Sequence, residues 1–230
     1  MPNKEYPSVL FENRIKAINE EVKDLFDIIL KHYRKAIQLL DNYDEKIADE
    51  VVEKSKEIDL QGYGLERKCI RFIAVEQPLA GDLMYVESTI RIISHAKRIA
   101  YLSANIAEYT KLIQGINIPE KILNDLQYMA DYVQIMSSKG TRSYLNLDIQ
   151  MAKELRDDDD KVDDLFDTIL NETTEVLAEK KDDILGMIYL IFIARSLERI
   201  ADRIVNIGYR TIFIETNERL DIKEIKEEIK

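Results

Sequence analysis

Apolar residues recur at steps of three and four along almost the whole chain, which is the period of amphipathic helices. The first run predicts a helix over residues 8–41, and the second predicts a helix over 44–76. A third helix is expected to begin at Pro78, whose missing N–H costs no hydrogen bond in a first turn, and to end before Gly115. The first half of the chain is therefore predicted to be three long helices.

The same periodicity restarts after a short break. Pro119 is expected in the first turn of a fourth helix, and Gly140 is either a kink in that helix or its end. A fifth helix is predicted over about 157–180 and a sixth over about 182–217. The mostly charged tail, 218–230, is expected to fray or to form a short helix.

Two of these predicted helices carry the same pattern, x-R-I-A-x-x-x-x-N-I. It occurs in SHAKRIAYLSANIAE, residues 94–108, and again in RSLERIADRIVNIGY, residues 195–209. Such an echo indicates an internal duplication. The fold class predicted is therefore all-α, with two tandem antiparallel three-helix bundles over 1–116 and 117–217 and a charged tail over 218–230.

The second helix has an echo of its own. DEKIADEV, residues 44–51, is similar to DDKVDDLF, residues 159–166. The two segments of this echo are further apart in the chain than the two segments of the other echo. The difference leaves about 14 extra residues in the first unit, around QPLAGDL, residues 77–83. The sequence therefore predicts a first hairpin that is longer by about two turns, or roughly 10 Å.

Composition excludes several classes of protein. The net charge is −11, which disfavours a nucleic-acid partner because phosphate binding requires an excess of Lys and Arg. Cys69 is the only cysteine, so no disulfide framework exists and a reducing, cytoplasmic location is expected. The segment MPNKEYPSVLFENRIK lacks the apolar core of a signal peptide. The longest apolar run, ILGMIYLIFIA over 184–194, is too short to span a bilayer and suits a buried helix.

Four acidic residues are the main candidates for chemistry. Asp159 and Asp163 form an i, i+4 pair beside the apolar stripe of the fifth helix, and Glu198 and Asp202 form a similar pair on the sixth. If the two helices pack antiparallel, the carboxylates converge and repel one another unless protons or a cation compensate them. Mg²⁺, Mn²⁺, Ca²⁺ or iron would suit such oxygen ligands. A solvated acidic face remains the alternative, and the run 157–160 by itself is typical of an acidic helix start.

No motif for an enzyme stands out. A ferritin-like di-iron site needs Glu-x-x-His on two helices, whereas His32 and His95 each follow an isoleucine at that spacing. No glycine-rich phosphate loop and no G-x-S-x-G motif is present. A rigid, acidic helical body of this kind is better suited to binding than to catalysis.

Three segments of the chain resemble the PhoU family of phosphate-uptake regulators: ARSLERIADRIVNI (194–207), DDKVDDLF (159–166) and QPLAGDL (77–83). The resemblance implies two three-helix bundles, each binding a multinuclear metal cluster through a pair of E(D)-x-x-x-D motifs. In the second bundle the implied ligands are Asp159, Asp163, Glu198 and Asp202. The identity of the metal, whether iron, Mg, Mn or Zn, stays open.

The first bundle departs from that family pattern. Its matching positions are Ser55, Asp59, Lys97 and Tyr101, of which only Asp59 is a carboxylate. We therefore expect the metal motif to be degenerate there, with the ammonium of Lys97 paired with Asp59 in place of a metal.

The resemblance also implies a role and partners. PhoU proteins restrain phosphate uptake and phosphate-starvation signalling, by contact with the ATPase of the phosphate ABC transporter and with a sensor histidine kinase. A homodimer is implied, as is a position peripheral to the membrane only through the transporter. Two other functions stay open: a metal-dependent hydrolase or oxidase using the same carboxylates, and a structural helical protein that binds no metal.

Overall fold

A computed structural model describes residues 9–179 and 184–217 of the chain. All regular secondary structure in these residues is helical. The helices are α1 (Val9–Asp41), α2 (Glu45–Glu76), α3 (Ala80–Leu112), α4 (Glu120–Asn146), α5 (Ile149–Glu179) and α6 (Ile184–Thr216).

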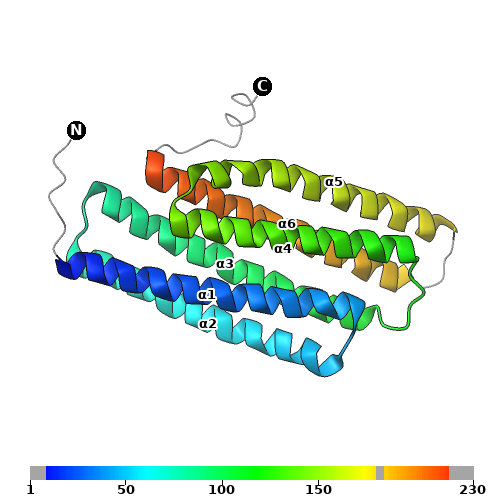
Figure 1. The fold of residues 1–230 in the computed structure, drawn as a ribbon. Helices are drawn as coiled ribbons and strands as arrows, with labels where there is room; N and C mark the ends of the chain where they lie inside the picture. The colour runs from blue at the N-terminus through cyan, green and yellow to red at the C-terminus, as the bar shows by residue number, and fades with distance from the viewer. Residues whose placement is uncertain (1–8, 180–183, 218–230) are drawn as a thin grey trace.

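The helices form two three-helix units that lie side by side, α1–α3 and α4–α6 (Figure 1). Helix α3 packs along α6 and α1 packs along α4, so these four helices make the centre of the molecule. Helix α2 covers α1 and α3 on one side, and α5 covers α4 and α6 on the other. The all-α fold predicted from the periodicity is confirmed.

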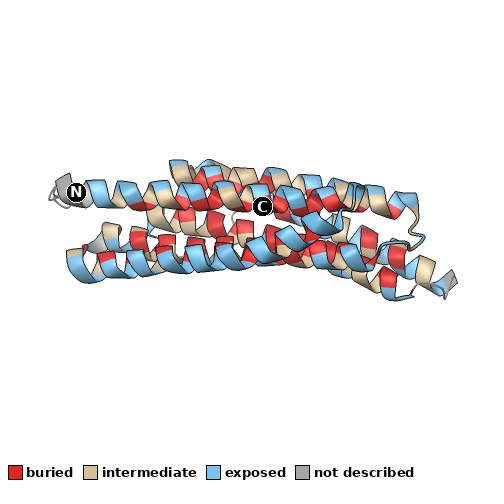
Figure 2. Cartoon of the chain, turned by 90° about the horizontal axis from the view of Figure 1, so that it is seen from below, coloured by how far each residue is buried: buried red, intermediate tan, exposed pale blue. Residues whose placement is uncertain are grey.

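One hydrophobic core runs through both units. Buried apolar residues from all six helices belong to a single packed cluster, and they recur on the inward side of each helix while the outer sides are exposed (Figure 2). Two buried hydrogen bonds also cross between the units: the Tyr33 hydroxyl donates to the Ala130 carbonyl oxygen at 2.7 Å, and Thr89 Oγ1 lies 2.9 Å from the Tyr144 hydroxyl. The two units are thus expected to unfold together, because neither has a separate core.

The repeated x-R-I-A-x-x-x-x-N-I pattern coincides with buried positions of both central helices. Ile99 and Ala100 of α3 are buried, as are Ile200 and Ala201 of α6. These shared apolar residues of the duplication therefore pack the core, and so do several positions that differ between the copies, such as Ala96 and Leu197.

Helix α5 begins earlier than predicted. The Asp148 side chain accepts a hydrogen bond from the Met151 N–H at 2.9 Å, which starts the helix at Ile149 rather than at Asp157. The acidic run 157–160 therefore lies more than two turns inside α5, and its interpretation as an acidic helix start was wrong. The true start was missed because Asp148 is a single polar residue within an otherwise continuous helical pattern.

The predicted extra length of the first hairpin is not found. Helices α2 and α3 have 32 and 33 residues, and α5 and α6 have 31 and 33. DEKIADEV begins at Asp44, the N-cap of α2, whereas DDKVDDLF lies well inside α5. The two segments thus occupy different positions in their helices, and the spacing between them does not measure the hairpin.

Other boundaries agree with the prediction to within a few residues. Helix α3 begins at Ala80, just after Pro78, and Gly115 with its φ of +79° lies in the turn that follows the helix. Gly140 is inside α4 and does not end it. The predicted beginning of the sixth helix at 182–183 and the predicted behaviour of the tail 218–230 lie outside the described residues.

The apolar run 184–194 belongs to α6, which places Met187, Leu190 and Ile193 in the core and leaves Leu185 and Phe192 exposed. None of the helices that the structure describes is both long enough and apolar enough to cross a membrane.

A close contact between α5 and α6 requires glycine at 208. A Cβ atom at Gly208 would lie 3.0 Å from the Ala152 carbonyl oxygen and 2.8 Å from Cδ1 of Leu155. The carbonyl belongs to a helix backbone and cannot rotate away. We expect Gly208→Val to lower the free energy of unfolding by about 1–3 kcal/mol through overpacking, measured by chemical denaturation.

Gly64 provides the matched control, because a Cβ atom there meets no atom within 4 Å and the residue is an exposed position inside α2. Gly64→Val should change the unfolding free energy by less than about 0.5 kcal/mol. Equal effects of the two substitutions would contradict the close approach of α5 and α6 at Gly208.

Candidate functional site

The four predicted carboxylates lie on two neighbouring helices. Helices α5 and α6 pack against each other, with Val162 of α5 and Leu197 of α6 buried between their neighbours. The residues next to these buried positions lie at the edge of the helix pair. They include Asp159 and Asp163 of α5 and Glu198 and Asp202 of α6.

The four side chains differ in their exposure to solvent. Asp159 is 5% exposed, which is unusual for an aspartate. The side chain of Glu198 is also mostly covered, whereas Asp163 and Asp202 are exposed. The set therefore extends from the surface down to a buried carboxylate between the helices.

The electrostatics show that these carboxylates act on one another. Burial, and then the charges of Asp163 and Asp202, raise the pKa of Asp159 from 3.8 to about 7. Burial and the charge of Asp202 raise the pKa of Asp163. Burial also raises the pKa of Glu198, with Arg195 opposing and Asp202 and Asp163 adding to the shift. The structure thus brings the acidic residues of α5 and α6 into one negative field.

Two arginines partly compensate this negative charge. Arg195 forms an ion pair with Glu198 one turn away on α6, and Arg156 lies 4.0 Å from an Asp159 oxygen and 3.2 Å from an Asp160 oxygen. Neither residue was singled out from the sequence, although their i, i+3 spacing to the carboxylates was a visible signal. Asp159 in particular keeps only a distant cationic partner.

The chemistry of the donor set fits a hard multivalent cation, since four carboxylates offer oxygen ligands and an uncompensated negative charge. Their side chains are not arranged as a finished coordination shell: among residues 9–179 and 184–217 no group of three or more His, Cys, Asp or Glu has the geometry to hold a metal ion. A cation at this position would have to draw Glu198 away from Arg195 and Asp159 away from Arg156.

The neighbouring Asp158 shows what a structural carboxylate looks like in this protein. It accepts hydrogen bonds from the Tyr132 hydroxyl and from Lys139 Nζ, both at 2.7 Å. Burial by itself would raise the pKa of Asp158, but these two hydrogen bonds and the charges of Lys139 and Lys161 outweigh it, so the pKa is lowered. Asp158 is therefore satisfied by α4, whereas burial and the neighbouring carboxylates raise the pKa of Asp159.

The corresponding position in the first unit is occupied by a lysine. Lys97 Nζ lies 3.6 Å from Asp59 and 3.2 Å from Glu66, so the ion pair with Asp59 predicted from the sequence is present. Glu66 was not predicted, because it lies two turns further along α2. Ser55 of α2 is buried, as Asp159 of α5 is, and Tyr101 stacks against the guanidinium of Arg98.

Comparison with known proteins agrees with this duplicated arrangement. A family model described as the PhoU domain matches the chain twice, at residues 22–110 and 126–211. The chain belongs to the PhoU family. The two matches fall on the two three-helix units, so each unit carries the pattern of the PhoU domain.

Several PhoU relatives match along nearly their full length. The phosphate-specific transport system accessory protein PhoU homolog 1 of Methanothermobacter thermautotrophicus is 46% identical over 94% of this chain and 99% of its own length. The PhoU homolog of Aquifex aeolicus is 30% identical over 93% of this chain and 96% of its own length.

Solved PhoU structures have the same fold. The crystal structure of PhoU from Pseudomonas aeruginosa has a TM-score of 0.86 at 22% identity and covers 90% of this chain and 100% of that one. The phosphate transport system regulatory protein PhoU from Streptococcus pneumoniae has a TM-score of 0.83 at 23% identity, with 92% and 100% covered. At this identity the two structures establish the PhoU fold of the chain.

Proposed function

We propose that this PhoU protein is a regulatory adaptor that restrains phosphate uptake and phosphate-starvation signalling. It would do so by contact with the ATPase subunit of a phosphate ABC transporter and, where one is present, with a sensor histidine kinase. The observation that carries the proposal is the 46% identity, over 94% of the chain, to a protein named as an accessory protein of the phosphate-specific transport system.

The form of the molecule supports binding rather than catalysis. The described residues make a rod of packed helices with one core, and such a body offers long, rigid helix faces to a partner. Contact with a transporter ATPase requires the chain to be cytoplasmic and peripheral to the membrane, and we expect it to act there as a homodimer.

We further propose that the carboxylates of the second unit hold one or more multivalent metal ions through Asp159, Asp163, Glu198 and Asp202. The raised pKa values of three of these groups support this, because a nearby cation relieves the repulsion that raises them. The metal would tie α5 to α6 and would supply no reaction of its own. The first unit would bind no metal, since Lys97 occupies that place.

The adaptor proposal is tested by co-purification from native membranes. The full chain with an affinity tag is expected to recover the phosphate transporter ATPase, and the purified ATPase is expected to bind the purified chain directly. Recovery should fall when untagged chain is added in excess, because both forms compete for one site.

Deletion of the chain gives the functional readout. Phosphate uptake in phosphate-rich medium is expected to rise, and a phosphate-starvation reporter is expected to remain switched on. Unchanged uptake in the deletion strain, together with no binding between the purified chain and the ATPase, would refute the adaptor role.

A further inference from the structure

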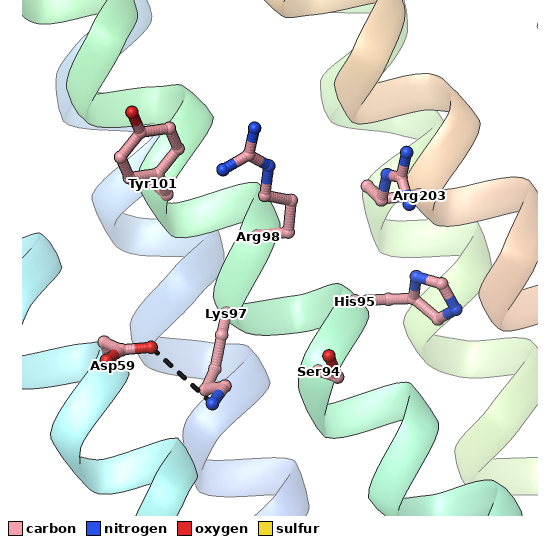
Figure 3. Close-up of a pocket in the computed structure, with 7 residues that line it drawn as sticks. All are labelled: Asp59, Ser94, His95, Lys97, Arg98, Tyr101 and Arg203. Atoms are coloured by element: carbon pink, nitrogen blue, oxygen red, sulfur yellow. Dashed lines mark ion pairs between the residues drawn. The ribbon is translucent and has the colours of Figure 1, made fainter.

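A hollow of about 400 Å³ opens where α3 meets α6, on the side that faces α2 (Figure 3). It is separate from the carboxylates of the second unit and plays no part in the proposed metal site. Its lining residues are Asp59, Ser94, His95, Lys97, Arg98, Tyr101 and Arg203.

The lining of the hollow is positively charged in a chain whose net charge is −11. Lys97 is already compensated, because Nζ points toward α2 and pairs with Asp59 and Glu66. Arg98 and Arg203 form no ion pair with any of the residues that the structure describes. The hollow thus holds two guanidinium groups whose charge no carboxylate balances.

The two guanidinium groups have different surroundings. Arg98 lies with its Cζ atom 4.4 Å from the centre of the Tyr101 ring, a cation–π contact that fixes its orientation. The Nε atom of Arg203 is buried and, within the described part of the chain, has no hydrogen-bond partner. A buried N–H without a partner costs free energy that a bound acceptor would recover.

The histidine that lines the hollow is neutral. Burial, followed by the charges of Arg203, Arg210 and Arg91, lowers the pKa of His95 to about 4. The imidazole therefore carries one N–H donor and no charge at neutral pH. In Figure 3 its ring lies beside Arg203, and Ser94 lies one residue before it on α3.

From these contacts we propose that the hollow between α3 and α6 is a binding site for a phosphate group. Arg98 and Arg203 provide the charge and the planar N–H donors that match phosphate oxygens, and the Ser94 hydroxyl and the His95 N–H add neutral donors. The site needs no contribution from a partner protein, so the inference is independent of the proposed contact with the ATPase.

The comparison between the two units supports an anion at this position. Glu198 and Asp202 of α6 correspond to Lys97 and Tyr101 of α3, so the acidic pair of the second unit is replaced in the first by a cation and by a ring that supports Arg98. The exchange thus removes the acidic pair that would repel an anion, and Arg98 and Arg203 give the hollow its uncompensated positive charge. A multivalent cation suits the α5–α6 site, and an oxyanion suits the hollow.

The size of the hollow allows two sources of the phosphate group. Orthophosphate fills only part of about 400 Å³, and the remainder would accommodate the organic portion of a small phosphate ester such as a nucleotide. The guanidinium groups would recognise both through the same phosphate oxygens. A larger affinity for ADP than for orthophosphate would identify the ester as the preferred source.

Isothermal titration calorimetry of the purified full chain, with inorganic phosphate and separately with ADP, tests the site. Titrations in chloride at matched ionic strength separate specific binding from general screening. Arg203→Gln is expected to weaken binding about tenfold or more, and Arg98→Gln by a similar factor, because each removes a charge-assisted donor.

Arg71→Gln is the matched control, since Arg71 is an exposed arginine of α2 outside the hollow and its loss changes the net charge equally. The affinity of the Arg71→Gln variant for orthophosphate and for ADP should equal that of the unchanged protein. Ser94→Ala, at an exposed position of α3, provides a variant that leaves the arginines and their packing in place and should weaken binding less than either arginine variant does.

Binding that Arg71→Gln reduces as much as Arg203→Gln would overturn the inference, because it would indicate general charge attraction. So would the absence of heat from the unchanged protein at millimolar orthophosphate and millimolar ADP. Folding of each variant is checked by its thermal transition, and if Arg203→Gln does not fold, Arg98→Gln and Ser94→Ala decide the question.

Discussion

Asp202→Ala is expected to abolish metal binding by this PhoU protein. The carboxylate of Asp202 contributes to the raised pKa values of Asp159, Asp163 and Glu198, so it lies within the common field of all three. It is also exposed, and its removal leaves the core unchanged. Elemental analysis after loading with iron, manganese, magnesium or zinc and dialysis should show metal in the unchanged protein and none in the variant.

The same experiment has a stability readout. A ligand that binds only the folded state at a hundred times its Kd stabilises the fold by about 2.7 kcal/mol, which raises the Tm of a chain of this size by about 5–10 °C. The unchanged protein should show this rise on addition of metal and lose it with a chelator. The Asp202→Ala variant should show neither change.

Asp59→Ala is the control, because Asp59 is the carboxylate of the first unit and pairs with Lys97. We expect this variant to keep its metal and its metal-dependent rise in Tm. Metal retained by Asp202→Ala but lost from Asp59→Ala would show that the site lies in the first unit and that our assignment is wrong. No metal on either variant or on the unchanged protein, with no change in Tm, would remove the site altogether.

Asp159→Asn is expected to stabilise the metal-free protein at alkaline pH. The folded pKa of Asp159, about 7, is above its ordinary value of 3.8, so the folded state holds the proton more tightly than the unfolded state. The stabilising effect of that proton is present below about pH 4 and is lost as the pH rises to about 7. At pH 8 the ionised carboxylate then destabilises the fold by up to about 4 kcal/mol, from a shift of about three pKa units at 1.36 kcal/mol each.

Asparagine has the same shape and never ionises. The unfolding free energies of the variant and of the unchanged protein should coincide near pH 4 and diverge by pH 8, with the variant more stable. Chemical denaturation across this range, in the presence of a chelator, measures the difference. Asp160→Asn, one residue away and exposed, changes the net charge equally and should show a much smaller divergence, because Asp160 adds less to the raised pKa of Asp159 than burial, Asp163 and Asp202 do.

If Asp160→Asn gives the same gain in stability at pH 8, the effect comes from net charge alone. If the unfolding free energies of Asp159→Asn and of the unchanged protein differ by a constant amount at all pH values, the raised pKa of Asp159 is contradicted. If Asp159→Asn also loses metal, the carboxylate is retained for binding at a cost to the metal-free fold. Destabilised groups at functional sites commonly have this combination of effects.

How far the pattern of apolar positions predicts this fold can be judged helix by helix. The steps of three and four define α2 to within a residue, because Asp44 is a capping residue directly before the pattern and its side chain accepts from the N–H groups of Lys46 and Ile47. The beginning of α5 was misplaced because the pattern of polar and apolar residues is the same before and after its cap, Asp148. A cap is a local contact, and sequence alone does not show which of several polar residues makes it.

The candidate site, too, could be predicted from the sequence only in part. The residue types and the i, i+4 spacing of the four carboxylates follow from the sequence, and so does the exchange of an acid for Lys97 in the first unit. Their differing surroundings do not. Asp158 and Asp159 are adjacent and chemically identical, yet Tyr132 and Lys139 of α4 satisfy one of them and leave the other buried beside two further carboxylates.

By itself the sequence determined the helices, the duplication and the family, because these depend on periodicity and on repeated motifs that are local in the chain. Only the tertiary structure decided which charges are compensated. Arg98 and Arg203 are more than a hundred positions apart in the sequence, and they line one hollow because α3 packs along α6. The electrostatic character of both sites therefore arises where helices meet, since the pKa and the free energy of a charge depend on the groups that surround it in space.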